Sequence, residues 1–345
     1  MSTRIRHVHG RRVWDSRGRP TIEAEVTLEG GAVGRAIAPA GASTGSAEAL
    51  DKRDGGEAFG GYDVRQALAG LADRLAPALK GQDALDQAGA DHRMIETDGT
   101  PNRAALGGNA LVAVSMAIAH AAAAQQGLPL WRYLAGDGAE PLLPLPEIQI
   151  FGGGAHAGRR VDVQDFMVIA VGAQDYAQSL DWTAEVYRAA GRWMSDAGRL
   201  QGVADEGGFW PAFDTNEQAL DALTQAIERA GLRPGEDVAI SLDIAATDFG
   251  RDGRYRLARE QREVGSEELS AMLLGWLARY PVVAIEDPLA EDDPQGLSAF
   301  TKAAGPRVQV VADDFICTNA ARIERAAAIG ACNTALIKPN QAGTD

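Results

Sequence analysis

The sequence predicts an α/β protein: a small α+β domain at residues 1–135, a linker at 136–146 and a βα barrel at 147–345. Three observations support this class. An alternating, strand-like region opens the chain. Apolar runs that end in ionisable residues recur through the second half, as in a repeated βα unit. The segment between them carries three prolines, which is typical of a linker.

The opening region predicts a three-stranded antiparallel meander. Residues 21–29 alternate between apolar and polar side chains, which indicates a strand with one buried face. Gly30 and Gly31 turn the chain into a second strand at 32–38, and residues 5–14 form the third. Helical periodicity follows, and the apolar segment 110–125 is expected to be a buried helix.

In the second half, four short apolar runs end in residues that can carry chemistry. They reach Asp243, Glu286, Asp313 and Lys338, and segments with helical patterns lie between them. A βα barrel places its active site at the carboxyl ends of its strands. A doubly wound open sheet would do the same, but it normally shows a glycine-rich phosphate turn that this sequence lacks.

Composition excludes several classes of protein. The 345 residues carry a net charge of −15, so nucleic acids and anionic membranes are poor partners. Cys317 and Cys332 are the only cysteines, which excludes a disulfide scaffold and fits a cytoplasmic protein. The N-terminus does not read as a signal peptide, and no apolar run of about 18 residues predicts a membrane span.

Convergence of the strand-end acids would create a metal site. Ionised carboxylates held close together repel one another unless a cation lies among them or their pKa values rise. Ligands that are all oxygen favour Mg²⁺ or Mn²⁺. Lys338 beside such a metal would act as a base, removing a proton next to a metal-held carboxylate. Each acid alone could instead cap a helix or pair with an arginine; their shared position at strand ends favours the site.

Two glycine-rich segments supply further candidates. Ser43 lies in a small-residue loop at 39–45 that could close over a ligand. Glu206 directly precedes two glycines, and His156 follows three. Glu206 and Asp165 could be a carboxylate pair that shares a proton and supplies a general acid.

Taken together, the motifs resemble those of the enolase family. The similarity runs in family order along the whole chain. The segments that carry it are DSRGRPT (15–21), GASTG with EAL and RDG (41–55), DGTPNRAALGGNA (98–110), HAG (156–158), QDFM (164–167), DEGG (205–208), LD (242–243), IEDPLAEDD (285–293), ADD (312–314) and IKPNQAGT (337–344).

The resemblance implies a metal centre with two Mg²⁺ ions for each active site, and Mn²⁺ as a substitute. Asp243, Glu286 and Asp313 match the ligands of the tightly held ion. Ser43 matches the loop residue that helps to hold the second ion once substrate is bound. Glu286 and Ser43 therefore also lie on the substrate side.

The resemblance also implies the catalytic residues. Lys338 matches the base that takes the C2 proton of 2-phosphoglycerate, and Glu206 matches the acid that protonates the departing C3 hydroxyl. His156 matches a loop histidine near the phosphate, Gln164 a substrate-side residue, and Asp165 the carboxylate beside Glu206.

The implied fold is a small α+β domain followed by a modified, TIM-like βα barrel, usually in a homodimer or higher homo-oligomer. The implied function is the glycolytic dehydration of 2-phosphoglycerate to phosphoenolpyruvate. One alternative is the same dehydration of a modified phosphoglycerate, as in phosphonate metabolism. Another is a non-catalytic, enolase-like binding protein. The partner in each case is a small phosphorylated carboxylic acid.

Three departures from the family pattern stand out. Asp165 occupies a position where the family has glutamate, and Gln149 and Gly152 occupy asparagine positions. The shorter Asp165 side chain withdraws its carboxylate by about 1.5 Å, which either weakens its pairing with Glu206 or makes room for a larger substrate. The chain also stops at Asp345, short of the family's closing segment. A protein ending there is expected to have an incomplete barrel, to aggregate and to be nearly inactive.

Overall fold

The structure is a computed structural model that describes residues 1–41, 43–136, 138, 140–210 and 212–344. The chain forms two compact units. The first contains Met1–Gly41, Ala47–Leu142 and Lys338–Asp345, and the second contains Ala42–Ser46 and Leu143–Ile337. The bounds drawn from the sequence, 1–135, 136–146 and 147–345, stay a proposal for the domain division.

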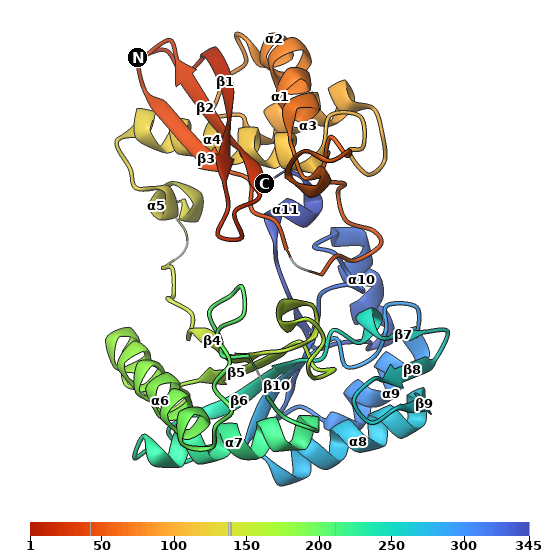
Figure 1. The fold of residues 1–345 in the computed structure, drawn as a ribbon. Helices are drawn as coiled ribbons and strands as arrows, with labels where there is room; N and C mark the ends of the chain where they lie inside the picture. Colours follow the sequence, from red (N-terminus) through yellow and green to blue (C-terminus); the bar gives the residue numbers. More distant parts are fainter. Residues whose placement is uncertain (42, 137, 139, 211, 345) are drawn as a thin grey trace. The chain divides into compact units, whose positions relative to one another are not determined.

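The first unit is built on an antiparallel meander, as predicted. Strands β1 (Ile5–Trp14), β2 (Pro20–Leu28) and β3 (Val33–Ile37) pair in that order (Figure 1). The apolar positions of β2 are buried, and Glu23, Glu25 and Thr27 are partly exposed, whereas Thr21 at the start of the strand is buried too. The helices of this unit are α1 (Arg65–Gly70), α2 (Ala76–Leu79), α3 (Gln87–Asp98), α4 (Gly108–Gln126), α5 (Leu130–Ala135) and α11 (Pro339–Ala342). A π-helical turn at Leu71–Leu75 joins α1 to α2, and a 3-10 turn lies at Ala58–Gly61.

Helix α4 is the centre of this unit's core, which agrees with the predicted buried helix. By length and composition it could cross a membrane, but 78% of its apolar window is buried inside the fold, as in the core helix of a globular domain. Its alanines allow the sheet to approach closely. A Cβ atom added to Gly34 in β3 would lie 2.2 Å from the Ala117 carbonyl oxygen and 2.2 Å from the Ala121 nitrogen.

The second unit contains a six-stranded sheet in the order β12-β11-β10-β6-β5-β4. Its strands are β4 (Glu147–Gly152), β5 (Asp165–Ile169), β6 (Ala239–Asp243), β10 (Val282–Glu286), β11 (Gln309–Ala312) and β12 (Thr334–Ala335). The last four in the chain pair in parallel, as the repeated pattern predicted, whereas β5 runs antiparallel to both β4 and β6. The class predicted from the sequence is confirmed; in the described residues the sheet is open, with β4 and β12 at its edges.

Helices cover the outer face of this sheet (Figure 1). Helices α6 (Tyr176–Asp196) and α7 (Asn216–Arg229) pack against β5, and α8 (Ser266–Arg279) packs against β10. Helices α9 (Pro294–Ala304) and α10 (Ala320–Ile329) follow β10 and β11 in the chain. A small sheet of β7 (Gly250–Arg251), β8 (Arg254–Leu257) and β9 (Arg262–Gly265) interrupts the βα pattern, and 3-10 turns lie at Gly154–Ala157 and Ala246–Asp248.

Replacing Gly34 by alanine should destabilise the first unit, because the added methyl group meets the backbone of α4, which cannot rotate away. We expect a loss of about 1–3 kcal/mol in the free energy of unfolding, measured by urea denaturation. The matched control is Gly275→Ala in α8, where an added Cβ has no neighbour within 4 Å. That variant should be about 0.5–1 kcal/mol more stable than the parent. Equal effects of the two substitutions would contradict the close approach of β3 to α4.

Candidate active site

The strand-end acids lie side by side at one end of the six-stranded sheet, where the parallel strands finish, as predicted. This end of the sheet is called its carboxyl edge. Asp243 ends β6 and Glu286 ends β10, and the two residues face each other in the parallel register. Asp313 follows the last residue of β11, the next strand. Because β5 is antiparallel to β6, its first residue, Asp165, reaches the same edge and faces Asp243.

Glu286 and Asp313 form a close carboxylate cluster with a third acid, Asp287. Single oxygen atoms from the three side chains lie within 4.8 Å of one another. Asp287 is buried, and its carboxylate accepts the backbone N–H groups of Asp313 at 3.0 Å and Asp314 at 2.8 Å. Burial, followed by the charge of Asp314, raises the pKa of the Asp287 carboxyl above its ordinary value. No role for Asp287 was expected from the motifs, but the structure shows that its side chain fixes the turn that carries Asp313.

Asp243 belongs to a second set of contacts, with Gln164 and Ser43. The Gln164 amide nitrogen donates a 2.8 Å hydrogen bond to Asp243 and lies 3.4 Å from the Ser43 hydroxyl. Ser43, distant in sequence, therefore lies beside this acid. Gln164 is 4% exposed, and within the described chain its Oε1 atom is buried without a hydrogen-bond partner.

These residues fit a hard divalent cation. Their donor atoms are all oxygen, and the carboxylates are close enough to repel one another strongly without a positive charge. The buried, unpartnered Oε1 atom of Gln164 is one more oxygen at the same edge. The donor set matches Mg²⁺ better than Zn²⁺, which prefers nitrogen and sulfur ligands.

His156 lies among three other carboxylates. Its Nδ1 atom is 2.6 Å from Asp205, and its Nε2 atom is 3.6 Å from Asp165 and 3.7 Å from Glu206. Burial of the ring is the largest single influence and lowers its pKa. The interactions with Asp165, Glu206 and Asp205 together outweigh burial and raise the pKa from 6.5 to about 9.

His156, Asp165 and Glu206 are also close enough together to hold a metal ion. Without a metal ion, a histidine with a pKa of about 9 is protonated at neutral pH, so the ring carries a positive charge that holds its carboxylate neighbours close.

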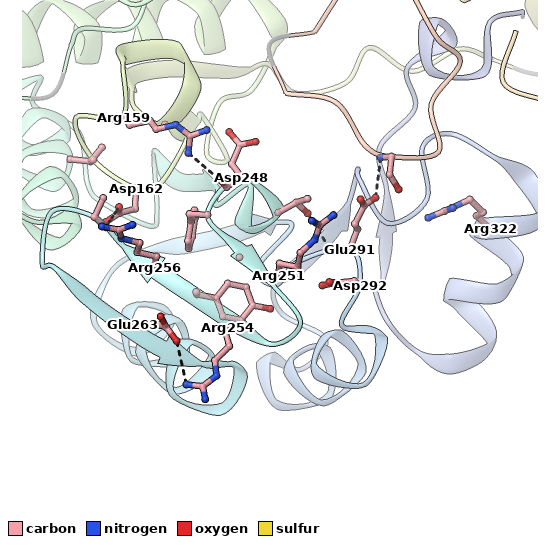
Figure 2. Close-up of a pocket in the computed structure, with 18 residues that line it drawn as sticks. Arg159, Asp162, Asp248, Arg251, Arg254, Arg256, Glu263, Glu291, Asp292 and Arg322 are labelled. Carbon is pink, nitrogen blue, oxygen red and sulfur yellow. Dashed lines mark hydrogen bonds and ion pairs between the residues drawn. The ribbon is translucent and has the colours of Figure 1, made fainter. Parts of the chain in front are cut away.

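A pocket of about 880 Å³ in the second unit lies apart from these clusters. Among the described residues, none of the nine predicted site residues lines it. Five arginines and five acidic residues do, and Figure 2 shows Arg254 paired with Glu263 and Arg159 directed at the backbone of Asp248. Because positive and negative residues are equal in number, the lining favours no charged ligand.

Comparisons with known proteins match both halves of the chain to one family. The family described as "Enolase, N-terminal domain" matches residues 5–134, and "Enolase, C-terminal TIM barrel domain" matches residues 140–345. The enolase of Acidothermus cellulolyticus is 47% identical over 340 residues, which cover 99% of this chain and 79% of that protein. The chain belongs to the enolase family.

Membership of this family confirms the resemblance seen in the sequence and makes the chain a carbon–oxygen lyase of the phosphopyruvate hydratase type. It therefore favours an enzyme over the non-catalytic binding protein. Lys338, the expected base of an enolase, precedes α11 and is grouped with the first unit. Its role, like the role of each site residue, stays a proposal.

Besides Asp287, two further residues of this enolase-family site are placed by the structure and had no role in the sequence analysis. Asp205 precedes Glu206 and contacts the far side of the His156 ring. Gln149 in β4 contacts both Asp165 and the backbone of Gly208. The sequence had marked both positions, since Asp205 belongs to the DEGG segment and Gln149 departs from the family pattern. It did not indicate which residues they contact.

His156 should make the stability of the protein depend on pH. Below pH 6.5 the ring is protonated in both the folded and the unfolded chain, and the stabilisation by its carboxylate partners is fully present. As the pH rises through about 9, the folded ring loses its proton and that stabilisation is lost. We expect the free energy of unfolding to fall over this interval by an amount on the order of 1–3 kcal/mol.

Urea denaturation at a series of pH values measures this loss. His156→Gln should remove most of the slope between pH 6.5 and 9. The control is His92→Gln, which alters an exposed histidine on α3 that contacts Glu96. It should leave the slope in place. A parent protein equally stable at both ends of the interval would contradict the assignment.

Proposed function

We propose that this chain dehydrates 2-phosphoglycerate to phosphoenolpyruvate in a Mg²⁺-dependent reaction, as in glycolysis. One observation carries the proposal. Carboxylates at the ends of β6, β10 and β11 lie at the same end of the sheet as Asp165, a member of the His156 cluster, which also contains Glu206, the proposed acid. An α-proton abstraction followed by loss of a hydroxyl group needs both parts.

Asp243, Glu286, Asp313 and Ser43 would hold the metal, with the two ions that the family resemblance implies. Bound Mg²⁺ supplies positive charge that offsets the negative charge accumulating on the substrate carboxylate as the C2 proton leaves. Asp287 keeps Asp313 in place through two backbone N–H groups, and Gln164 orients Asp243.

The proton transfers are assigned to two residues. Lys338 takes the proton from C2, and Glu206 gives a proton to the C3 hydroxyl as it departs. Protonated His156 lies 3.6 Å from Asp165 and 3.7 Å from Glu206, so it stabilises the carboxylate that Glu206 becomes once it has given up its proton, and it contributes positive charge for a substrate phosphate. Gln164, Ser43 and Glu286 complete the substrate side.

The proposal extends to assembly and location. We infer a homodimer or higher homo-oligomer in the cytoplasm, acting on a small phosphorylated carboxylic acid and not on nucleic acid. Trp14 and Phe59 on the first unit support self-association. They are 54% and 46% exposed, and their rings meet edge-on with centroids 6.4 Å apart. Exposed aromatic side chains of this size are typical of contact surfaces.

A second candidate function has its own supporting observation. The shortened Asp165 and the exchanged Gln149 alter the acid side of the site, which favours a modified phosphoglycerate as the substrate. The same chemistry would then act on a different phosphate or leaving group. Steady-state rates on 2-phosphoglycerate distinguish the candidates, because turnover at the upper end of roughly 1–10³ s⁻¹ supports the first.

Asp313→Asn should weaken Mg²⁺ binding while leaving the fold intact, because the neutral amide keeps the shape of the side chain and removes its charge. We expect a loss of roughly 10- to 100-fold in affinity, measured by calorimetric titration. Asp292→Asn is the control, since Asp292 lines the separate pocket and should bind Mg²⁺ as the parent does. Unchanged affinity in Asp313→Asn would contradict the metal site.

Glu206→Gln and Lys338→Ala should separate the two proton transfers. In deuterated buffer, Glu206→Gln should still exchange the C2 proton of 2-phosphoglycerate although product formation falls about 10²- to 10⁴-fold. Lys338→Ala should lose exchange as well as product. Nuclear magnetic resonance of the substrate follows the exchange. Exchange at the parent rate in Lys338→Ala would assign the base to another residue.

A further inference from the structure

Gln149 links strand β4 to the loop that carries Glu206, the proposed acid. It lies in β4 and is 8% exposed, next to a register shift in the pairing of β4 with β5. Its amide nitrogen donates a hydrogen bond to Asp165 on β5. Its amide oxygen accepts the backbone N–H group of Gly208 at 2.8 Å. Both ends of this buried amide are therefore used.

These bonds complete a ring of contacts that begins and ends on one loop. From Gly208 the contacts run through Gln149 to Asp165, then to His156 at 3.6 Å, and from His156 to Asp205 at 2.6 Å. We call this set the contact ring. Asp205 and Gly208 flank Glu206, so the ring holds the acid's backbone on both sides. A 2.7 Å hydrogen bond between Ala204 and Gly208 closes the turn itself.

Two glycines make room for Gln149. A Cβ atom on Gly208 would lie 2.5 Å from the Gln149 amide oxygen, and a Cβ atom on Gly152 would lie 2.9 Å from its amide nitrogen. A side chain at either position would push the amide out of its place. Gly152 is one of the departures from the family pattern, and a Cβ atom there would also lie 2.6 Å from the Ala204 Cβ atom, so the space without a side chain lies between Gln149 and Ala204.

The departures at positions 149, 152 and 165 thus fit together as one change. Relative to the family, Gln149 is longer by one methylene group and Asp165 is shorter by one, about 1.5 Å in each case. The longer amide reaches the withdrawn carboxylate, and Gly152 leaves space for it. A glutamate at position 165 would extend into the amide that now binds Asp165.

We propose that Gln149 is a positioning residue matched in length to Asp165, and that these two residues with Gly152 hold the Glu206 loop in its working position. The inference rests on the proposed function, because it assigns the ring's purpose to the acid of that reaction. Gln149 acts through Asp165 and Gly208, so it governs the acid's placement. Misplacing a catalytic group by about 1 Å can cost on the order of 10²-fold in rate.

The test is a double-mutant cycle on the whole protein with saturating Mg²⁺ and 2-phosphoglycerate. Gln149→Asn leaves Asp165 without its donor, and Asp165→Glu drives a longer carboxylate into Gln149. Each should lower kcat about tenfold or more, with KM changed less than about threefold. The combined variant carries both substitutions and restores the family lengths. It should recover kcat to within about threefold of the parent, either alone or after Gly152→Asn is added to it.

A matched control shows that shortening a glutamine is harmless elsewhere. Gln218 accepts the backbone N–H group of Asp214, outside the ring, and Gln218→Asn should keep the parent kcat. Recovery of kcat in the combined variant supports the matched pair, because loss of stability alone would add and not cancel. Multiplied losses in the combined variant, with and without Gly152→Asn, would overturn the proposal.

Failure of the proposed function has a different signature. If the parent does not turn over 2-phosphoglycerate, the substrate assignment fails. The same four proteins are then compared by urea unfolding without ligand, and the coupling between the two substitutions is calculated from their unfolding equilibrium constants. A coupling of at least about fivefold in the unfolding equilibrium constant between positions 149 and 165 supports the pair, and additive effects overturn it.

Discussion

Mutual repulsion among acids gathered at one sheet edge is the constraint on which the site depends. The parallel register of β6, β10 and β11 brings Asp243, Glu286 and Asp313 to that edge. The register is itself held by buried apolar residues on these strands, since a slip of one residue would turn them to the opposite face. Hydrogen-bond donors offset the repulsion between these carboxylates. Two backbone N–H groups donate to Asp287, and the side-chain amide of Gln164 donates to Asp243. Protonated His156 does the same for the acids beside it.

The antiparallel strand β5 joins the two halves of the site. In a sheet of parallel strands alone, the first residue of β5 would lie at the opposite edge. Because β5 is reversed, Asp165 faces Asp243, and Gln164, one residue earlier, contacts Asp243 directly. The carboxylates proposed to hold the metal and the His156 cluster are therefore linked through two neighbouring residues of one segment. A change at Asp165 affects His156 on one side and Gln149 on the other.

Much of this arrangement could be predicted from the sequence, because it depends on local patterns. The alternation of apolar and polar residues predicted the meander. Apolar runs that end in acids predicted the parallel strands and the gathering of those acids where the strands end. The family motifs supplied the nine candidate site residues, whose roles stay a proposal. The roles of Asp287, Asp205 and Gln149 could not be predicted, since each depends on a loop approaching from elsewhere in the chain. Gln149 also lies next to a register shift in the pairing of β4 with β5, and no local sequence pattern indicates that shift.

The division of the chain between its two units limits how the protein can be dissected. Residues 338–344 pack with the first unit, where the backbone N–H group of Ala49 donates to the Gln341 carbonyl at 2.7 Å, whereas the loop around Ser43 belongs with the second. No single cut in the chain releases either unit with all of its parts. A fragment that starts at the linker would carry Lys338 without the neighbours that order its segment, and a fragment that ends there would carry Ser43 without Gln164. Domain exchange between relatives would therefore require four junctions, one at each boundary between the units.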